Sequence, residues 1–188
     1  ISYHKYSTLA KIQQIIDKIV AGENCGLVSD AGMPCISDPG ELLVKLAKEY
    51  NMPAVAITDH GNMFGATRFF DACKEVGIKP IFGTEFYVTD DVTVKKGKQK
   101  FSHLVILAKN ETGYKNLSKL VSMGFTDGFY YKPRIDLEIL EKYHEGLICL
   151  SACLAGSVNK QILKNDIEEA EKIALWHKNL FGEDYYLE

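Results

Sequence analysis

The stretch that most constrains the fold is Ala54–Gly65, which reads AVAITDHGNMFG. Its first four residues are all apolar, which is typical of a strand buried on both faces. Gly61 then favours a turn towards a helix, so Asp59 and His60 are expected at the strand's carboxyl end. Ligand and catalytic groups collect at such ends in α/β folds. His60 could bind a metal or exchange a proton, or Asp59 could simply cap the helix, and both interpretations remain open.

Short apolar runs alternate with amphipathic stretches along the rest of the chain. The predicted strands are 25–29, 54–57, 79–88 (broken or bulged at Gly83), 103–108 and 146–150. The predicted helices are 8–21, 41–49, 64–76, 111–123, 136–142 and a last one capped by Asn165, with Glu168 completing a capping box. This alternation predicts an α/β fold with mostly parallel strands, either a barrel or an open sheet.

Composition narrows the class of protein. The net charge of -3 over 188 residues argues against a generally basic, nucleic-acid-binding surface. No apolar run approaches the length of a membrane span, and five cysteines without a disulfide-like density favour a reducing, cytoplasmic environment. The chain begins at Ile1 rather than Met, and its final residues, Tyr185–Glu188, resemble the start of a strand. We therefore expect a fragment of a longer protein.

Four side chains form a candidate metal site. His60, Glu85, His103 and Cys153 each lie at or near the end of a predicted strand, and each can bind zinc or manganese. Their spacing does not establish that they converge. His103 could be an ordinary boundary residue and Cys153 a small core residue, so the chemistry alone leaves the site open.

Three other stretches could bind ligands. The loop Ser29–Gly40, which includes Asp30 and Gly32, could admit a nucleotide-like cofactor or be a well-capped connection. The run Lys95–Lys100 has four lysines that could contact phosphates, although a solvated loop tip is favoured. Aromatic and cationic residues in Gly128–Arg134 could stack on bases, but an ordinary packing loop is favoured.

From about residue 43 to residue 188 the chain resembles the polymerase and histidinol phosphatase (PHP) domain family, as found in bacterial DNA polymerase III alpha subunits. The matching stretches are 52–65, 77–88, 103–117, 128–136 and 146–156. The resemblance implies a distorted β/α barrel with a metal cluster at its strand ends, and partners that include DNA and other polymerase subunits. His60, Glu85, His103 and Cys153 fall on ligand positions of this family, which implies bound zinc or manganese.

Residues 1–42 lack the family's opening His-x-His strand. Ile1–His4 and Leu27–Gly40 instead resemble the 16S ribosomal RNA 2′-O-ribose methyltransferases of the tetrapyrrole-methylase superfamily. That resemblance implies that Asp30 and Gly32 belong to an S-adenosylmethionine loop, although too little of that enzyme is present for us to expect binding. The first strand–helix unit of the barrel would thus be replaced, giving a chimera of segments 1–42 and 43–188.

A chimera of this kind would hold only part of the PHP metal cluster. We therefore expect weakened metal binding and at most a residual, metal-dependent phosphoesterase activity, with no catalytic residue assigned. The alternatives are a methyltransferase fragment or an inactive hybrid.

Overall fold

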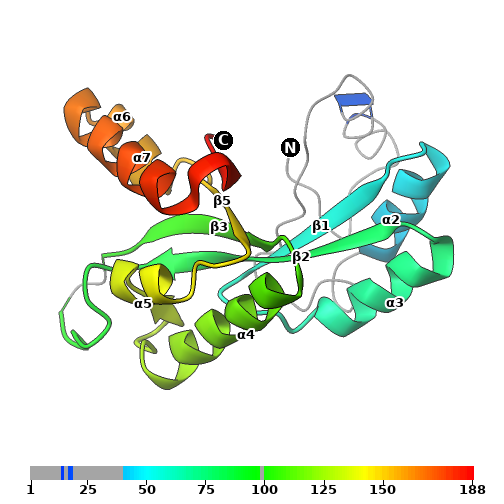
Figure 1. Ribbon diagram of the computed structural model, residues 1–188, viewed down its shortest axis with the longest axis horizontal. Helices are drawn as coiled ribbons and strands as arrows, with labels where there is room; N and C mark the ends of the chain where they lie inside the picture. The colour runs from blue at the N-terminus through cyan, green and yellow to red at the C-terminus, as the bar shows by residue number, and fades with distance from the viewer. Residues whose placement is uncertain (1–13, 15–16, 19–39, 98–99) are drawn as a thin grey trace. The chain divides into compact units, whose positions relative to one another are not determined.

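The computed structural model describes residues 14, 17–18, 40–97 and 100–188 (Figure 1). The described residues belong to two compact units. The first runs up to Asp59 and includes Phe64–Phe82, and the second consists of His60–Met63 and Gly83–Glu188. The predicted strand 25–29 and the loop after it, with Asp30 and Gly32, lie outside the described residues, as does most of the predicted helix 8–21.

The first unit is built around a small apolar core. It contains helices α2 (Gly40–Glu49) and α3 (Ala66–Val76), most of strand β1 (Ala54–His60) and the first part of β2 (Lys79–Val88). Glycine ends α3 as predicted, because Gly77 takes a left-handed φ of 70° and donates to the last carbonyls of the helix. Burying each large apolar side chain contributes about 1.5–3 kcal/mol. The core residues are Val44, Ala47, Ile57, Phe69, Cys73 and Ile78.

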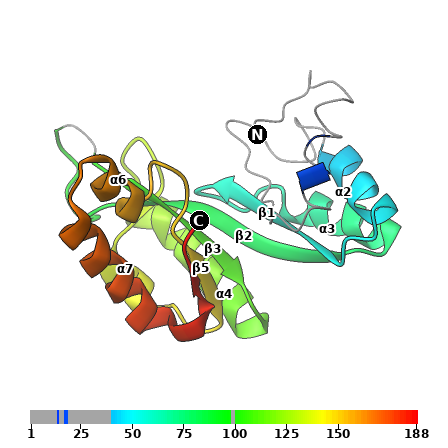
Figure 2. The same cartoon turned by 90° about the horizontal axis from the view of Figure 1, so that it is seen from above.

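The second unit carries most of the sheet and the remaining helices. Helices α6 and α7 lie side by side, and α4 packs on β3 (Figure 2). Among the described residues, every helix is too short or too polar to cross a membrane. The elements are β3 (Ser102–Ala108), α4 (Glu111–Thr126), β4 (Arg134–Ile135), α5 (Leu137–Lys142), β5 (Leu147–Leu150), α6 (Ser157–Leu163), α7 (Ile167–Phe181) and β6 (Tyr185–Tyr186).

The sheet is mixed. Its strand order is β1-β2-β3-β5-β6, with β4 beside β2. The α/β class is thus confirmed, but β2 with β3 and β3 with β5 are antiparallel, whereas the shorter β2–β4 and β5–β6 pairings are parallel. β3 thus departs from the predicted direction. Its connection to β2 contains no described helix, which permits antiparallel neighbours, whereas it is antiparallel to β5 although α4 and α5 lie between them in the chain.

Two local predictions also need correction. Strand β2 continues through Gly83, which pairs with Leu107, so the expected break is absent from this strand. Helix α7 is capped by Asp166, whose carboxylate accepts a hydrogen bond from the Glu169 amide. Asn165 instead takes a left-handed φ of 62°, a conformation that Asn tolerates better than most residues. The capping motif therefore begins one residue later than predicted.

Candidate metal centre

The four predicted metal ligands come together within the second unit. His60 ends β1, Glu85 lies inside β2, His103 is the second residue of β3, and Cys153 follows β5. In the antiparallel register Tyr87 faces His103, which makes His103 the diagonal neighbour of Glu85 on the same sheet face. Glu85 therefore reaches the site from within β2.

The ligand atoms are close enough to surround one ion. One ring nitrogen or carboxylate oxygen from each of His60, Glu85 and His103 lies within 4.8 Å of the others. Glu85 Oε1 accepts a hydrogen bond of 2.6 Å from His103 Nδ1, and Glu85 Oε2 lies 3.8 Å from His60 Nδ1. The Cys153 sulfur is 3.7 Å from Glu85 Oε1 and 3.6 Å from His103 Nδ1.

This donor set fits zinc. Two imidazoles, a carboxylate and a thiol are all ligands of tetrahedral zinc, whose bond lengths separate neighbouring ligand atoms by about 3.3–3.8 Å. The Cys153 contacts and the His60–Glu85 distance fall in or close to that range. The shorter contact between Glu85 and His103 is a hydrogen bond, which a bound ion would replace.

The Glu85 carboxylate is kept ionised by its neighbours. Glu85 is only 4% exposed. Burial on its own would raise the pKa of Glu85, but the hydrogen bond from His103, the nearby charges of His60 and His103, and the Cys153 contact hold this pKa below its ordinary value of 4.5. An ionised carboxylate is the form that binds a metal, and both imidazoles must be neutral to bind the same ion.

Aromatic rings line the two histidines, and sequence reasoning missed them. Tyr87 stacks on His60 with a centroid distance of 5.8 Å and meets His103 edge-on at 5.3 Å. Phe101 stacks on His103 at 6.1 Å. The alternation of Glu85 and Tyr87 along one strand could have suggested a shared face, but only the register brings both rings to the histidines.

The turn after His60 depends on glycine. Gly61 has a φ of +66°, and its amide donates to the Glu85 carbonyl at 2.9 Å. A Cβ at this position would lie 2.6 Å from Pro133 Cγ and 3.3 Å from the Tyr87 ring. A larger residue would therefore push the chain away from the ligands just where it leaves the site.

Asp59 and His60 turn out to have different roles. Asp59 is buried, and its Oδ2 accepts a hydrogen bond of 3.4 Å from the amide of Gly65, the residue just before α3. His60 lies among the candidate ligands. Asp59 is therefore not the cap of α3, whose N-cap is Gly65 without a side-chain hydrogen bond, and the ligand role of His60 stays a prediction.

The other candidate stretches show no comparable cluster in their described parts. Lys95 and Lys96 are exposed, in keeping with a solvated loop. Arg134 is 2% exposed and donates to the carbonyls of Gly128, Val92 and Val94. Its guanidinium is therefore committed to holding loops together, which favours the packing interpretation of 128–134.

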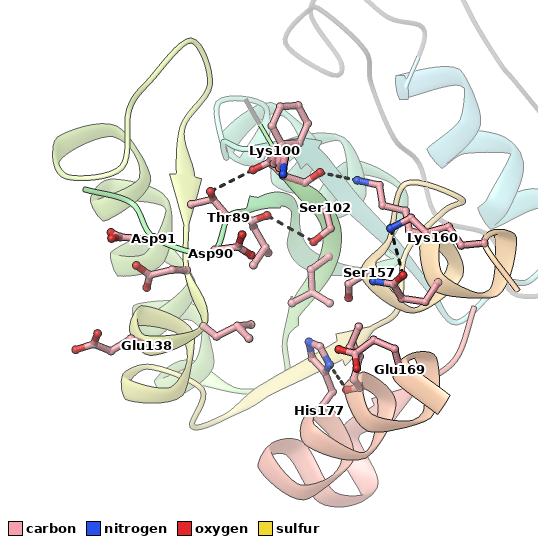
Figure 3. A pocket seen from close by; sticks show the side chains of 18 of the residues that line it. Thr89, Asp90, Asp91, Lys100, Ser102, Glu138, Ser157, Lys160, Glu169 and His177 are labelled. Carbon is pink, nitrogen blue, oxygen red and sulfur yellow. Dashed lines mark hydrogen bonds between the residues drawn. The ribbon is translucent and has the colours of Figure 1, made fainter. Parts of the chain in front are cut away.

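A separate cavity of about 1290 Å³ lies in the second unit, and none of the four candidate ligands lines it (Figure 3). Asp90, Asp91 and Glu138 line one side, and Lys160 reaches across to the Phe101 carbonyl from the other. His177 also lines it. Burial lowers the pKa of His177, although the hydrogen bond to the Ile173 carbonyl acts in the opposite direction. The mixed charges indicate no single class of ligand.

Residues 37–188 match the PHP domain family. The chain belongs to the PHP domain family. The match covers the sheet, the helices from α2 onward and all four candidate ligands, so the PHP assignment made from sequence motifs is confirmed.

Several relatives of this PHP domain are bacterial proteins named DNA polymerase III subunit alpha. The protein of Borreliella burgdorferi is 50% identical over 151 residues, which is 78% of this chain and 13% of the relative. That of Chlamydia trachomatis is 49% identical over 149 residues (77% and 12%), and that of Aquifex aeolicus 46% over 155 residues (78% and 13%). The chain thus spans about an eighth of the relatives it matches.

Among solved structures, a Bifidobacterium adolescentis protein assigned as a metal-dependent phosphoesterase aligns with 53% of this chain and 30% of its own. The TM-score is 0.34 and the sequence identity 20%. Because this TM-score is low, the family assignment rests on the PHP family match and on the polymerase relatives alone.

Proposed function

We propose that this chain forms the PHP domain of a bacterial DNA polymerase III alpha subunit and that the domain holds a divalent metal ion. The family match and the roughly 50% identity to polymerase subunits support the first part. The observation that carries the second is the convergence of His60, Glu85 and His103. A role in DNA replication, with DNA and other polymerase subunits as partners in the cytoplasm, follows from the same proposal.

The ion in this proposal is zinc or manganese, held by His60, Glu85, His103 and Cys153. Glu85 supplies the negative charge that a dication requires, and the histidines supply neutral nitrogen donors. Cys153 is exposed, and its sulfur accepts a hydrogen bond from the Ala155 amide. When bound, the ion would supply Lewis-acid chemistry suited to a phosphoester.

Any hydrolytic activity of the domain is proposed to be residual, and no residue is assigned as catalytic. The first barrel unit of the family is the part that the sequence predicts to be replaced, which removes ligands from the cluster. The domain would then bind a metal more for its own structure, or for the polymerase that contains it, than for turnover.

The methyltransferase origin of residues 1–42, with a boundary between 42 and 43, stays a sequence prediction. No comparison supports it, and Asp30 and Gly32 lie outside the described residues. Titration with S-adenosylmethionine tests it: we expect no binding, and tight binding would restore the methyltransferase interpretation for this segment.

Zinc titration by calorimetry tests the metal site. We expect one ion per chain, and we expect His60→Ala and His103→Ala each to weaken binding beyond the roughly 10–100-fold typical of changes to outer-shell partners. His144→Ala is the matched control, because His144 bonds the Glu141 carbonyl outside the cluster. Unchanged affinity in both ligand variants, or no binding by the parent chain, would refute the proposed site.

A further inference from the structure

Tyr87 contacts two candidate ligands at once. It lies two residues after Glu85 on β2, so both side chains project from the same sheet face. Its ring is nearly parallel to His60, with 17° between the planes, and nearly perpendicular to His103, at 80°. We propose that Tyr87 is a positioning residue that fixes the ring planes of both histidines for metal binding.

The need for such a residue follows from histidine geometry. The torsion that turns an imidazole about its Cβ–Cγ bond has broad energy wells, so a histidine without neighbours does not hold one ring plane. A metal accepts the nitrogen lone pair only when that plane points at the ion. The two imidazoles here lie 5.3 Å apart with 64° between their planes, and each of them also contacts Tyr87.

Phe101 contacts only one of the two candidate histidine ligands, His103. Its ring stacks on His103 with only 4° between the planes and meets Tyr87 edge-on at 5.0 Å. Among the ring contacts of the described residues, Phe101 touches His103 but not His60. Loss of Phe101 should therefore loosen His103 alone, whereas loss of Tyr87 removes a ring contact from both imidazoles.

The Tyr87 ring is itself held in place. Its backbone pairs with His103 on one neighbouring strand and with Arg134 on the other. The Lys132 ammonium lies 5.3 Å from the ring centroid, and the side chain is only 7% exposed. Because the Tyr87 ring is held in this way, it can restrict the ring orientations of His60 and His103.

Three variants of the full chain separate positioning from general stability. Tyr87→Leu removes the ring, and Tyr87→Phe restores it without the hydroxyl. Phe86→Leu is the matched control: Phe86 is 1% exposed and points to the opposite face of β2, so its loss costs core packing without touching the histidines. Zinc affinity comes from calorimetry, and the histidine ring-proton shifts come from NMR of the metal-free chain.

Tyr87→Leu should weaken zinc binding by roughly 10–100-fold, as outer-shell changes do, and should shift the His60 and His103 ring protons. Tyr87→Phe should restore both readouts, and Phe86→Leu should leave both unchanged. His144 and His177 serve as internal references. Parent-like affinity and shifts in Tyr87→Leu, or an equal loss of affinity in Phe86→Leu, would overturn the proposal.

The inference rests on the proposed metal site, but the two can fail separately. If the parent chain binds no zinc, the metal site fails, and the ring-proton shifts still report whether Tyr87 orders the imidazoles. If Tyr87→Leu does not fold, the inference is tested in the parent chain by nuclear Overhauser contacts between the Tyr87 ring and the two histidine rings. Contacts to both rings would support the inference, and contacts to one or none would overturn it.

Discussion

Two buried charges in the second unit, Glu85 and Arg134, have opposite kinds of neighbours. Glu85 is surrounded by groups that can themselves bind a metal: two imidazoles and a thiol. Arg134 is surrounded by backbone carbonyls and by the Tyr130 ring, 5.5 Å away. Both side chains are almost fully inaccessible to solvent. Burial of a charge therefore does not distinguish a site from a scaffold, whereas the chemistry of its partners does.

The difference has a physical basis. A guanidinium that donates several hydrogen bonds to fixed carbonyls is satisfied and has nothing left to offer a ligand. The Glu85 carboxylate accepts a hydrogen bond from His103 and lies 3.8 Å from His60 Nδ1, so a cation could replace that hydrogen bond and bind the same groups. The first arrangement stabilises the loops 89–97 and 127–133, and the second is ready to exchange a hydrogen bond for a metal.

The largest effect is expected on stability when Arg134 is replaced. Arg134→Met removes a charged donor and leaves the carbonyls of Gly128, Val92 and Val94 without it. We expect a loss of about 3 kcal/mol of unfolding free energy, which lowers Tm by about 6–12 °C. Thermal and urea denaturation measure this loss.

Arg134→Met also tests whether the role of Arg134 is separate from that of the metal site around Glu85. Zinc binding should survive Arg134→Met at temperatures where the variant stays folded, because Arg134 donates to carbonyls and not to the ligands. If the variant is as stable as the parent chain, these buried hydrogen bonds contribute little to stability. If the folded variant loses zinc binding, the metal site depends on Arg134, and the distinction drawn between Glu85 and Arg134 fails.

A smaller effect is expected in the pH dependence of stability. The folded-state pKa of Glu85 is held below its unfolded value of 4.5, against the effect of burial, by His103, His60 and Cys153. This carboxylate therefore contributes stability above about pH 4.5, which is lost as the pH falls through the lower folded pKa.

Metal-free melting curves recorded at a series of pH values from about 6 down to about 3 test this. The acid-induced loss of Tm should be shallower in Glu85→Gln than in the parent chain, and it should persist in Arg134→Met. Identical pH profiles in the parent and Glu85→Gln would contradict the assigned pKa direction.

Much of the fold follows from local patterns in the sequence. Apolar runs located β1, β2, β3 and β5, and glycine marked the end of α3. The antiparallel pairing of β3 with β2 could have been inferred from the helix-free connection between them, whereas its antiparallel pairing with β5 depends on long-range contacts that no local pattern encodes. The cap of α7 was misplaced by one residue because Asn165 and Asp166 are both good caps, and only the backbone angle distinguishes them.

The candidate site was accessible only in part. The chemistry of His60, Glu85, His103 and Cys153 suggested zinc, yet their convergence came from the family resemblance and not from spacing. Tyr87 escaped notice because an aromatic residue in a strand is ordinarily core, and its contact with both histidines depends on the Tyr87–His103 register. The role of Arg134 was equally hidden, since no sequence pattern tells a buried arginine from a surface one.

Cobalt substitution tests the central claim most directly, namely that these four side chains bind a single ion. One equivalent of Co²⁺ should give tetrahedral d–d bands and a thiolate-to-cobalt charge-transfer band. The charge-transfer band should vanish in Cys153→Ser, while Cys149→Ser, at a buried cysteine outside the cluster, retains it. If the parent chain gives no such band, or Cys153→Ser leaves it intact, these side chains do not form the metal site described here.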